Sequence, residues 1–353
     1  MKRLIMGISF AFLAWGGSAG AGTLKVATYN VQNLFDLVRS GTEYEEYIPN
    51  TAMGWNRKTA AIKYGNIARV ISDMAADIIA LQEVESKRAL DLLRDTIARR
   101  GLRYPYSAIA DLKESAVKCA LLSRFPITST REIPVEEEPS RNILAVTVQV
   151  EGIPLILFVN HWKSKHGPES LRLPYARALR RVINTLPAAA DFIVLGDLNS
   201  NYDEFRTFRA RARLNDTGGR TGINHVLGTI VDHELVTEKV LLHQEGNRCL
   251  YNLWLEIPPP RRWSYSFFGQ RDSPDNMIIP GALYDSRGIS YVDNSFNRFV
   301  RRYLFRNHMV FRWQRAENGK GGHLGEGFSD HLPIFALFST GPFQHHQPVS
   351  IHK

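Results

Sequence analysis

Short apolar runs recur along this chain, and most of them end at a polar residue. They occupy residues 24–31, 77–85, 117–122, 155–159 and 192–195. Such a run, without regular polar alternation, predicts a strand that is covered on both faces. Residues 143–150 alternate instead, which predicts a half-buried strand, and Gly152 indicates a hairpin-like turn before the next run. Shorter apolar segments at 251–255, 263–268, 277–279 and 335–338 predict further strands late in the chain.

Between these strands, apolar residues recur at helical spacing. Three segments have apolar faces, made of Ile67, Val70, Ile71 and Met74, of Leu90, Leu93 and Ile97, and of Tyr175, Leu179, Val182, Ile183 and Leu186. We expect the first helix to begin at Asn56 and the second to end before Gly101. Residues 203–213 predict a fourth helix with Phe205 and Phe208 inward. Strands and helices mix throughout, without a repeat or an obvious linker, which predicts an α/β fold with helices outside the sheet layers.

The first residues have the features of a secretory signal peptide. Lys2 and Arg3 precede an apolar run at 4–15, and Ala19-Gly20-Ala21 fits a small-residue cleavage site. The run is shorter than the roughly 20 residues that a membrane span requires. We therefore expect an exported protein, periplasmic or secreted, without stable membrane insertion. Residues 1–21 are the expected signal peptide, 22–340 a single domain and 341–353 a flexible tail.

The chain is basic, with a formal net charge of +9. An exported basic protein suits an anionic partner such as nucleic acid, and acidic lipid would fit equally. Arg177, Arg180 and Arg181 lie opposite an apolar helix face, where a solvated surface is the simpler interpretation. The two cysteines, Cys119 and Cys249, are compatible with one disulfide or with two buried free thiols.

Polar residues of the acid, amide and imidazole types cluster at the ends of the predicted strands. They are Asn30, Glu83, His161, Asp197, Asn199, Asp275, Asp330 and His331. Each alone is compatible with an ordinary turn. Together they predict a site, because converging carboxylates repel one another and a divalent cation relieves that repulsion. Oxygen ligands without a Cys/His cluster favour Mg²⁺, with Mn²⁺ or Ca²⁺ as alternatives.

Six segments in order carry a family resemblance: TYNVQNLF, ALQEVE, VNHWKSK, GDLNS, PDNMII and FSDHLPI. With these segments the chain resembles the endonuclease/exonuclease/phosphatase superfamily, and within it the bacterial extracellular DNase-like branch, over residues 25–338. The resemblance implies a four-layer α/β sandwich, in which two packed mixed β-sheets are flanked by helices. One departure is Asn276, which stands where many members of that branch have a histidine, so an acid–base role at this position is not expected.

The resemblance also implies residue roles. Glu83 would bind the catalytic metal, helped by Asn30 and Asp330. Asp197 would orient or deprotonate the attacking water, and Asn199 would hold the scissile phosphate. The remaining expected roles are phosphate contact by His331 paired with Asp275, proton donation to the leaving oxygen by His161, a place near the phosphate for Arg141, and an extension of the anionic site by Lys163 and Lys165.

These roles predict a divalent-metal-dependent phosphodiester hydrolase. The favoured function is an exported nuclease that cuts DNA, or RNA, by in-line attack of a water activated by Asp197. An exported phospholipid or sugar-phosphate phosphodiesterase, similar to a sphingomyelinase, is the first alternative. A non-catalytic module that binds nucleic acid or a surface is the second. The sequence does not distinguish DNA from RNA or endonucleolytic from exonucleolytic cutting, and it identifies no protein partner.

Overall fold

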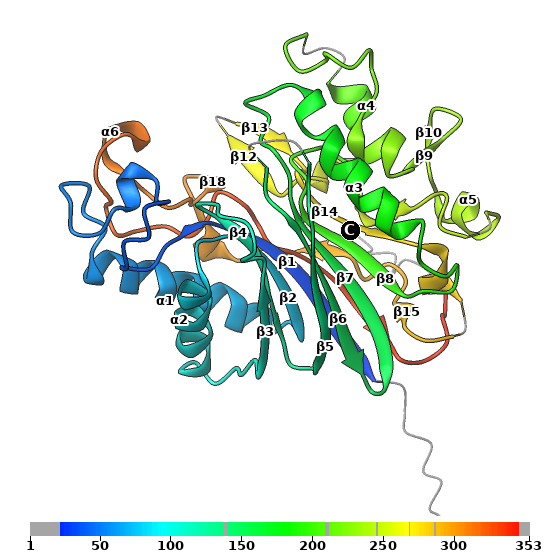
Figure 1. Ribbon diagram of the computed structural model, residues 1–353, viewed down its shortest axis with the longest axis horizontal. Helices are drawn as coiled ribbons and strands as arrows, with labels where there is room; N and C mark the ends of the chain where they lie inside the picture. Colours follow the sequence, from blue (N-terminus) through cyan, green and yellow to red (C-terminus); the bar gives the residue numbers. More distant parts are fainter. Residues whose placement is uncertain are drawn as a thin grey trace, which may run out of the picture.

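Two β-sheets lie face to face at the centre of the computed structural model, with helices on their outer faces (Figure 1). The structure describes residues 22–345, apart from 137–139, 209–211, 245, 268 and 286. The expected signal peptide, residues 1–21, therefore lies outside the described residues, as do residues 346–353 of the expected tail. Within the described part of the tail, Phe343 packs against Tyr284, with 4.6 Å between the ring centres.

The first sheet has the strand order β15-β19-β1-β2-β4-β3, and β16 also pairs with β19. Its strands are β1 (Thr23–Leu34), β2 (Ile78–Val84), β3 (Tyr106–Ile109), β4 (Lys118–Ser123), β15 (Ser290–Tyr291), β16 (Asn297–Arg298) and β19 (Ile334–Ser339). β1 and β2 are parallel, because α1 (Arg57–Met74) returns the chain between them. The other pairs in this sheet are antiparallel.

The second sheet has the order β11-β14-β8-β7-β6-β5. Its strands are β5 (Ile127–Ile133), β6 (Ile143–Val150), β7 (Ile153–His161), β8 (Phe192–Asp197), β11 (Tyr251–Asn252) and β14 (Asp275–Ile279). Here β7 and β8 are the parallel pair, and α3 (Leu173–Ile183) connects them. Each sheet thus contains one strand–helix–strand unit among antiparallel neighbours, which makes both sheets mixed.

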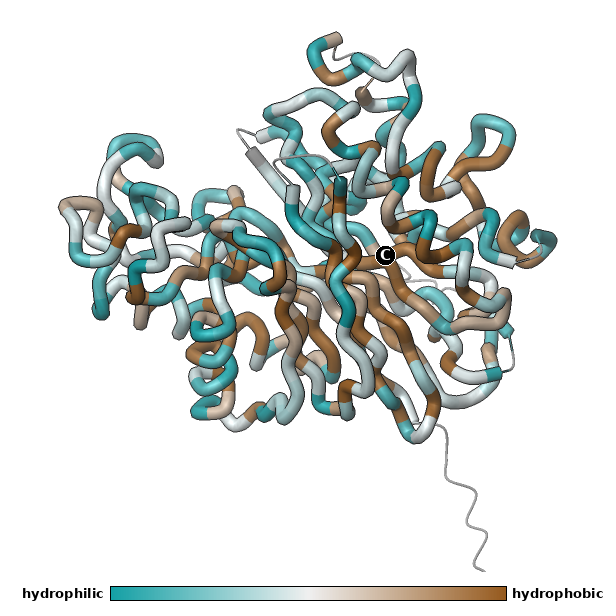
Figure 2. Tube along the Cα trace, viewed as in Figure 1, coloured by the Kyte–Doolittle hydropathy of each residue, from teal (hydrophilic) through white to brown (hydrophobic). Residues whose placement is uncertain are grey.

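Three apolar clusters hold the layers together. The first lies between the sheets and includes Val26, Ala80 and Leu121 from one sheet and Val146, Leu157 and Leu195 from the other. The second packs α1 and α2 (Lys87–Ala98) on the first sheet, and the third packs α3 on the second sheet. Figure 2 shows hydrophobic residues concentrated along the central strands. The expected four-layer sandwich is confirmed.

Short elements decorate this frame. They are the pairs β9 (Ile230–Val231) with β10 (Glu234–Leu235), β12 (Tyr265–Phe267) with β13 (Gln270–Asp272) and β17 (Phe305–Arg306) with β18 (Met309–Val310), the helices α4 (Glu204–Thr207), α5 (Glu238–Leu242) and α6 (Ala316–Gly319), and the single turns η1 (Glu45–Tyr47), η2 (Glu169–Leu171), η3 (Gly222–Val226), η4 (Leu253–Glu256), η5 (Pro259–Arg261), η6 (Gly281–Tyr284) and η7 (Arg302–Leu304). Several of these line the polar edge of the sandwich described below.

Local signals explain where the long helices begin. Asn56 caps α1: its side chain accepts hydrogen bonds from the backbone N–H groups of Lys58 and Thr59, and the Thr59 hydroxyl accepts one from the backbone N–H of Asn56. The predicted start of α1 is therefore confirmed. Ser86 caps α2 in the same way through the backbone N–H of Ala89.

Two predictions from local pattern were wrong in extent. Among the described residues of the helix expected at 203–213, only Glu204–Thr207 form a helix, α4, and Phe205 and Phe208 are buried as expected. The strand expected at 251–255 covers only two residues, because the chain turns into η4 once the pairing of β11 with β14 ends. Cys119 and Cys249 are both buried and free, so no disulfide joins them. Within the described ranges, no helix is long and apolar enough to cross a bilayer.

Candidate active site

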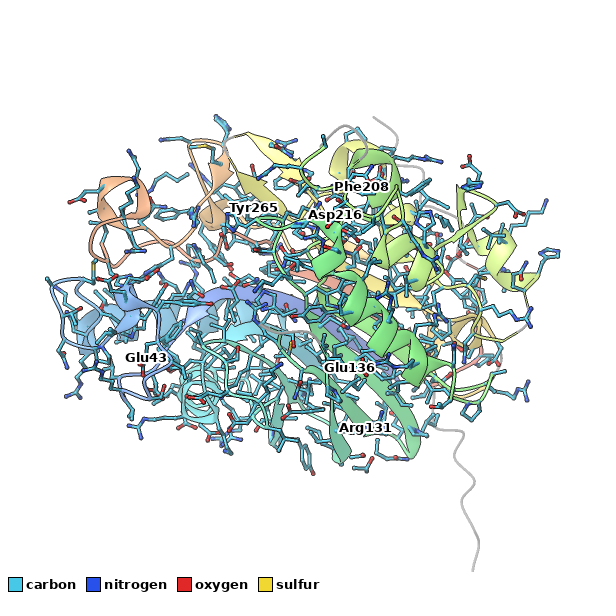
Figure 3. All side chains as sticks on the ribbon, turned by 45° about the horizontal axis from the view of Figure 1, so that its top comes forward. Glu43, Arg131, Glu136, Phe208, Asp216 and Tyr265 are labelled. Carbon is cyan, nitrogen blue, oxygen red and sulfur yellow. The ribbon has the colours of Figure 1, made fainter. Side chains whose placement is uncertain are left out.

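The polar strand ends meet at one edge of the sandwich. Asn30 lies in β1 and Glu83 in β2, while His161 and Asp197 are the last residues of β7 and β8. Asp275 reaches the same place because β14 runs antiparallel to β8, with Asp275 opposite Asp197. His331 precedes β19 and forms a backbone bridge with Tyr265. Figure 3 shows Tyr265 in the upper part of the molecule and Arg131 of β5 near its lower side.

Gly196 allows the two parallel strands of the second sheet to end side by side. Its φ is +123°, and a Cβ at this position would lie 2.2 Å from the carbonyl oxygen of Asn160. Only glycine fits both the backbone conformation and the space. This close approach places His161 directly opposite Asp197 in the β7–β8 register.

Glu83 occupies an unusual backbone conformation. Its φ is +66°, at a point where the pairing register between β1 and β2 shifts. A non-glycine residue in the left-handed region costs free energy, and such strain often accompanies a functional site. The Glu83 carboxylate accepts hydrogen bonds from the Asn30 side chain and from the backbone N–H of Asn33, which fixes its direction.

Asn30 joins the two central carboxylates. Its Nδ2 lies 3.0 Å from Oε1 of Glu83 and 2.9 Å from Oδ2 of Asp197. Its Oδ1 accepts a hydrogen bond from the backbone N–H of Gln32. Asn30 therefore directs its N–H groups at the carboxylates, and its side chain would have to turn before its oxygen could face a cation between them.

Two histidines lie on either side of Asp197. Nε2 of His161 is 3.8 Å from Oδ2 of Asp197 and 3.7 Å from Oε1 of Glu83, whereas Nε2 of His331 is 3.9 Å from the same Asp197 oxygen. His331 also makes a buried 2.7 Å contact through Nδ1 with Oδ2 of Asp275. The predicted Asp275–His331 pairing is thus present in the geometry.

The surroundings shift the pKa values of these groups in different directions. Burial alone would lower the pKa of His331, but the charge of Asp275 and its hydrogen bond, helped by Asp197 and Asp330, raise it to about 10. Burial lowers the pKa of His161 well below its usual value, and the charges of Arg141 and His331 add to this effect. Burial raises the pKa of Asp197 to about 6 against the opposing charge of His331. Without a metal or substrate, His331 is the imidazole that holds a proton.

Several of the expected phosphate-binding residues already have partners within the protein. Asn199 donates from Nδ2 to the carbonyl oxygen of Trp162, and Arg141 reaches the same carbonyl at 3.4 Å. Burial lowers the pKa of Lys163, and the nearby positive charge of Arg141 lowers it further. Lys165 instead lies 2.6 Å from the buried carboxylate of Glu204, so its charge is already compensated.

The helix arginines also have structural partners. Arg180 donates to the carbonyl oxygens of Val226 and Asn247. Arg181 pairs with Glu136 on the surface. The exposed Arg177 and Arg181 fit the expected solvated helix face, but Arg180 does not, because it is partly buried with its Nη2 withdrawn from water and burial lowers its pKa.

Asp330 stands apart from the carboxylate centre. Its Oδ2 is 3.5 Å from Nη2 of Arg312, and its Oδ1 is 3.9 Å from Nε2 of His331. One group that could hold a metal ion consists of Glu83, His161 and Asp197. Their candidate ligand atoms all lie within 4.8 Å of one another. A second such group consists of Asp197, Asp275 and His331. Asp197 is common to both.

This arrangement fits a divalent cation. The carboxylates are wholly or largely withdrawn from water, and burial of like charges without a counter-ion is unfavourable. Oδ1 of Asp275 and Nδ1 of His161 are buried without a hydrogen-bond partner among the described residues. The donor set is mostly oxygen with imidazole nearby, which suits Mg²⁺ or Mn²⁺.

Three residues at this edge escaped the sequence patterns. The Ser264 hydroxyl donates to Oδ2 of Asp275, the Tyr265 ring lies 4.9 Å from the His331 ring, and the fully buried Lys63 donates to the carbonyl oxygen of Phe328. Ser264 and Tyr265 lie in the segment 263–268, for which the sequence predicts a strand but no site residue. Lys63 lies within an amphipathic helix, where a lysine is normally read as solvated, so no local signal identifies it.

Asn276 has a structural role. Its Nδ2 donates to the carbonyl oxygens of Ser200 and Pro274, and its Oδ1 accepts a hydrogen bond from Nδ2 of Asn252. The residue is completely buried. The amide thus ties the loop after β8 to β14, which agrees with the expectation that this position takes no part in acid–base chemistry.

Comparisons with known proteins agree with this fold. The model of the Endonuclease/Exonuclease/phosphatase family matches residues 25–227. The structure is similar to that of TDP2 from Caenorhabditis elegans, with 15% identity, a TM-score of 0.52 and coverage of 90% of this chain and 74% of that chain. It is also similar to D. rerio TDP2 complexed with a single strand DNA product, with 13% identity, a TM-score of 0.53 and coverage of 90% and 98%.

A third similar structure is that of ANGEL2, a 2′,3′-cyclic phosphatase, in complex with adenosine-2′,3′-vanadate. It has 15% identity, a TM-score of 0.54 and coverage of 91% of this chain and 97% of that chain. Among curated protein sequences, none matches this chain. At these identities, the structural similarities concern the fold alone.

Proposed function

We propose that this chain, which belongs to the endonuclease/exonuclease/phosphatase family, is a divalent-metal-dependent nuclease. The observation that carries the proposal is the position of Asp197. This buried carboxylate accepts a hydrogen bond from Asn30 and has an imidazole within 4 Å on either side, 3.8 Å to His161 and 3.9 Å to His331. A phosphodiester hydrolase needs such a group to hold a water in line with the leaving oxygen.

The surrounding residues can supply the other requirements of the reaction. Asp197 accepts a hydrogen bond from the attacking water and orients it, and can take its proton as the bond to phosphorus forms. The side-chain amide of Asn199 and the guanidinium of Arg141 offer donors for the nonbridging oxygens. His331, the imidazole beside Asp197 that holds a proton, can pass it to the leaving oxygen, so that the leaving group departs as an alcohol. The lowered pKa of His161 disfavours the donor role that the sequence predicts for it.

Glu83 and Asp197 would hold the divalent ion, with His161 at the edge of the same group. When bound, such an ion would neutralise charge on the phosphate oxygens. Burial raises the pKa of Asp197 because it disfavours the charged carboxylate. A bound cation would offset this effect by stabilising the charged form. Asp330 would act from further out, through His331 and Arg312.

Nucleic acid is the proposed substrate. The net charge, +9 for the full sequence and 9 − 2 = +7 without Lys2 and Arg3, favours a polyanion, and Lys163 lies near Arg141, the residue expected beside the phosphate. We also propose export, which rests on residues 1–21, and a place in the exported DNase-like branch of the family, which rests on the segment NHWKSK and on SRN at 140–142. A phospholipid or sugar-phosphate diester is the alternative substrate, because it offers the same phosphate chemistry.

Cleavage assays test this proposal. Purified protein is incubated with supercoiled plasmid, with RNA and with sphingomyelin vesicles, each with Mg²⁺ and with EDTA. We expect Mg²⁺-dependent cutting of nucleic acid that EDTA abolishes. Cleavage of sphingomyelin alone would favour the lipid alternative, and nucleic-acid binding without cutting in any divalent cation would favour a non-catalytic module. N-terminal sequencing of the exported protein tests the cleavage site, with Gly22 as the expected first residue.

A further inference from the structure

A second polar feature lies away from the candidate active site. It is a pocket of about 300 Å³ beside the C-terminal end of α1 and the edge strand β16. Four basic side chains line it, from Lys25, Arg261, Arg298 and Arg301. The one acidic residue in its wall is Asp73. We call these four side chains the basic pocket.

The carboxylate of Asp73 contacts groups other than the four side chains of the basic pocket. It accepts a hydrogen bond from the Tyr303 hydroxyl and lies 3.8 Å from both Arg69 and Arg100, which are outside the pocket. The four basic side chains of the pocket have neutral partners instead. Lys25 donates to the carbonyl of Met74, Arg261 to the side chain of Asn297, Arg298 to the carbonyl of Trp263 and Arg301 to the carbonyl of Val300.

Arg298 shows that positive charge is concentrated here. Its Nε is buried without a hydrogen-bond acceptor in the part of the chain that the structure describes. Burial, with the nearby charges of Arg261 and Arg271, lowers the pKa of Arg298 to about 10. Arg271 and Arg298 both lie over the Trp263 ring, at 4.5 and 4.4 Å from its centre. A guanidinium that is partly desolvated among like charges is stabilised by a bound anion.

The basic pocket is close enough to the active site to hold the same polymer. Arg298 pairs with Ile334, the first residue of β19, which follows His331 by three residues, and three residues of chain span at most roughly 10 Å. Backbone phosphates of one strand in a duplex are spaced by about 3.4 Å of helix axis. A strand with its scissile phosphate beside Asp197 could therefore place a phosphate a few nucleotides away at the basic pocket.

We propose that the basic pocket binds a backbone phosphate of the nucleic acid strand, remote from the bond that is cut. This inference rests on the proposed nuclease function, which it extends by a second contact with the substrate. Arginine forks suit a phosphate group because they donate two parallel hydrogen bonds to its oxygens. The contact would increase affinity for long substrates and would leave the chemistry at Asp197 unchanged.

The test measures binding without cleavage. A fluorescein-labelled 20-nucleotide single strand is titrated in EDTA, at several salt concentrations, with the parent protein and with Arg261→Gln/Arg301→Gln. Both side chains are exposed, so the fold should be retained. The matched control, Arg181→Gln/Arg287→Gln, removes two exposed charges elsewhere. We expect the pocket variant to bind roughly tenfold more weakly at low salt, with a salt slope smaller by about 0.7 per lost phosphate contact, and the control to change less than twofold.

Equal binding by the pocket variant and the control would overturn the proposal. Bis(p-nitrophenyl) phosphate is a diester too small to reach the basic pocket from the active site. Its turnover with Mg²⁺ should therefore be unchanged in the pocket variant. A loss of this turnover would contradict the proposal that the basic pocket is separate from the catalytic site. Vesicles of phosphatidylglycerol test a lipid source. If the pocket variant loses vesicle binding but keeps strand binding, the ligand is a lipid headgroup and the strand assignment is wrong. A parent protein that binds the strand but never cuts it contradicts the nuclease function alone.

Discussion

Nδ2 of Asn30 lies 2.9 Å from Oδ2 of Asp197, although 167 residues separate them in the chain. Asn30 belongs to the first sheet and Asp197 to the second, so this hydrogen bond joins the two sheets at the edge that holds the candidate site. The same amide nitrogen also bonds Glu83. Asn30 therefore fixes the distance between the two carboxylates best placed to hold a cation.

Replacing Asn30 with alanine should weaken metal binding more than it weakens the fold. The change removes the donor that Glu83 and Asp197 share, so their charges repel without a bridge. Groups that orient metal ligands typically contribute about 10–100-fold in affinity, and we expect a loss of this order. Calorimetric titration with Mg²⁺ measures it directly. An unchanged Mg²⁺ affinity in a folded variant would contradict the bridging role.

Asp197→Asn should lose nucleolytic activity while remaining folded. The amide has the size of the carboxylate but cannot accept the proton of the attacking water. A general base contributes typically about 10²–10⁴-fold, which sets the expected loss in the cleavage rate. Plasmid nicking under Mg²⁺ measures the rate, and circular dichroism checks the fold. Parent-like cutting by this variant would show that another group activates the water.

Gly196→Ala should destabilise the protein far more than Gly152→Ala. A Cβ at position 196 would lie 2.2 Å from the Asn160 carbonyl oxygen, whereas one at position 152 meets nothing within 4 Å. Both glycines have positive φ, +87° at 152 and +123° at 196, so both substitutions add backbone strain and only the one at 196 adds the clash. We expect about 3 kcal/mol or more of lost unfolding free energy at 196 and about 1 kcal/mol at 152. Urea unfolding of both variants provides the comparison.

Glu256→Gln should stabilise the protein above pH 7. The Glu256 carboxylate lies with Glu238 and Asp293, whose oxygens approach within 4.8 Å of it. Burial, with these neighbouring charges, raises the pKa of Glu256 from 4.5 to about 7, despite a hydrogen bond from Tyr251. Between these values the folded protein keeps a proton that the unfolded chain has lost, so stability falls as pH rises through this window.

Glutamine carries no charge at any pH, so the variant should lose less stability over the same pH range. Melting temperatures measured in EDTA from pH 4.5 to 8 test this, since EDTA prevents a cation from screening the three carboxylates. The exposed Glu136→Gln serves as the control and should follow the parent curve. If Glu256→Gln falls as steeply as the parent with rising pH, Glu256 does not carry this dependence.

The sequence by itself determined most of the long strands, the three long helices and the residues at the strand ends, but it missed the edge strands β3 and β5. Hydrophobic periodicity is a local property, and the runs that became β1, β2, β7 and β8 are apolar enough to be buried in almost any arrangement. The four-layer sandwich was predicted from the resemblance of the motifs to a known family. Where the pattern was short or mixed, as in α4 and β11, tertiary contacts decided the outcome.

Only the tertiary structure decided which polar atoms meet. It turned the amide of Asn30 toward two carboxylates, paired Lys165 with Glu204, placed Arg312 beside Asp330 and brought Ser264 to Asp275. It also gathered the basic pocket from three separate segments. These contacts depend on how two sheets pack against each other over long sequence separations. A polar side chain can form hydrogen bonds with several nearby partners at similar free energy. Which partner it bonds is therefore not reflected in any periodic pattern of the sequence.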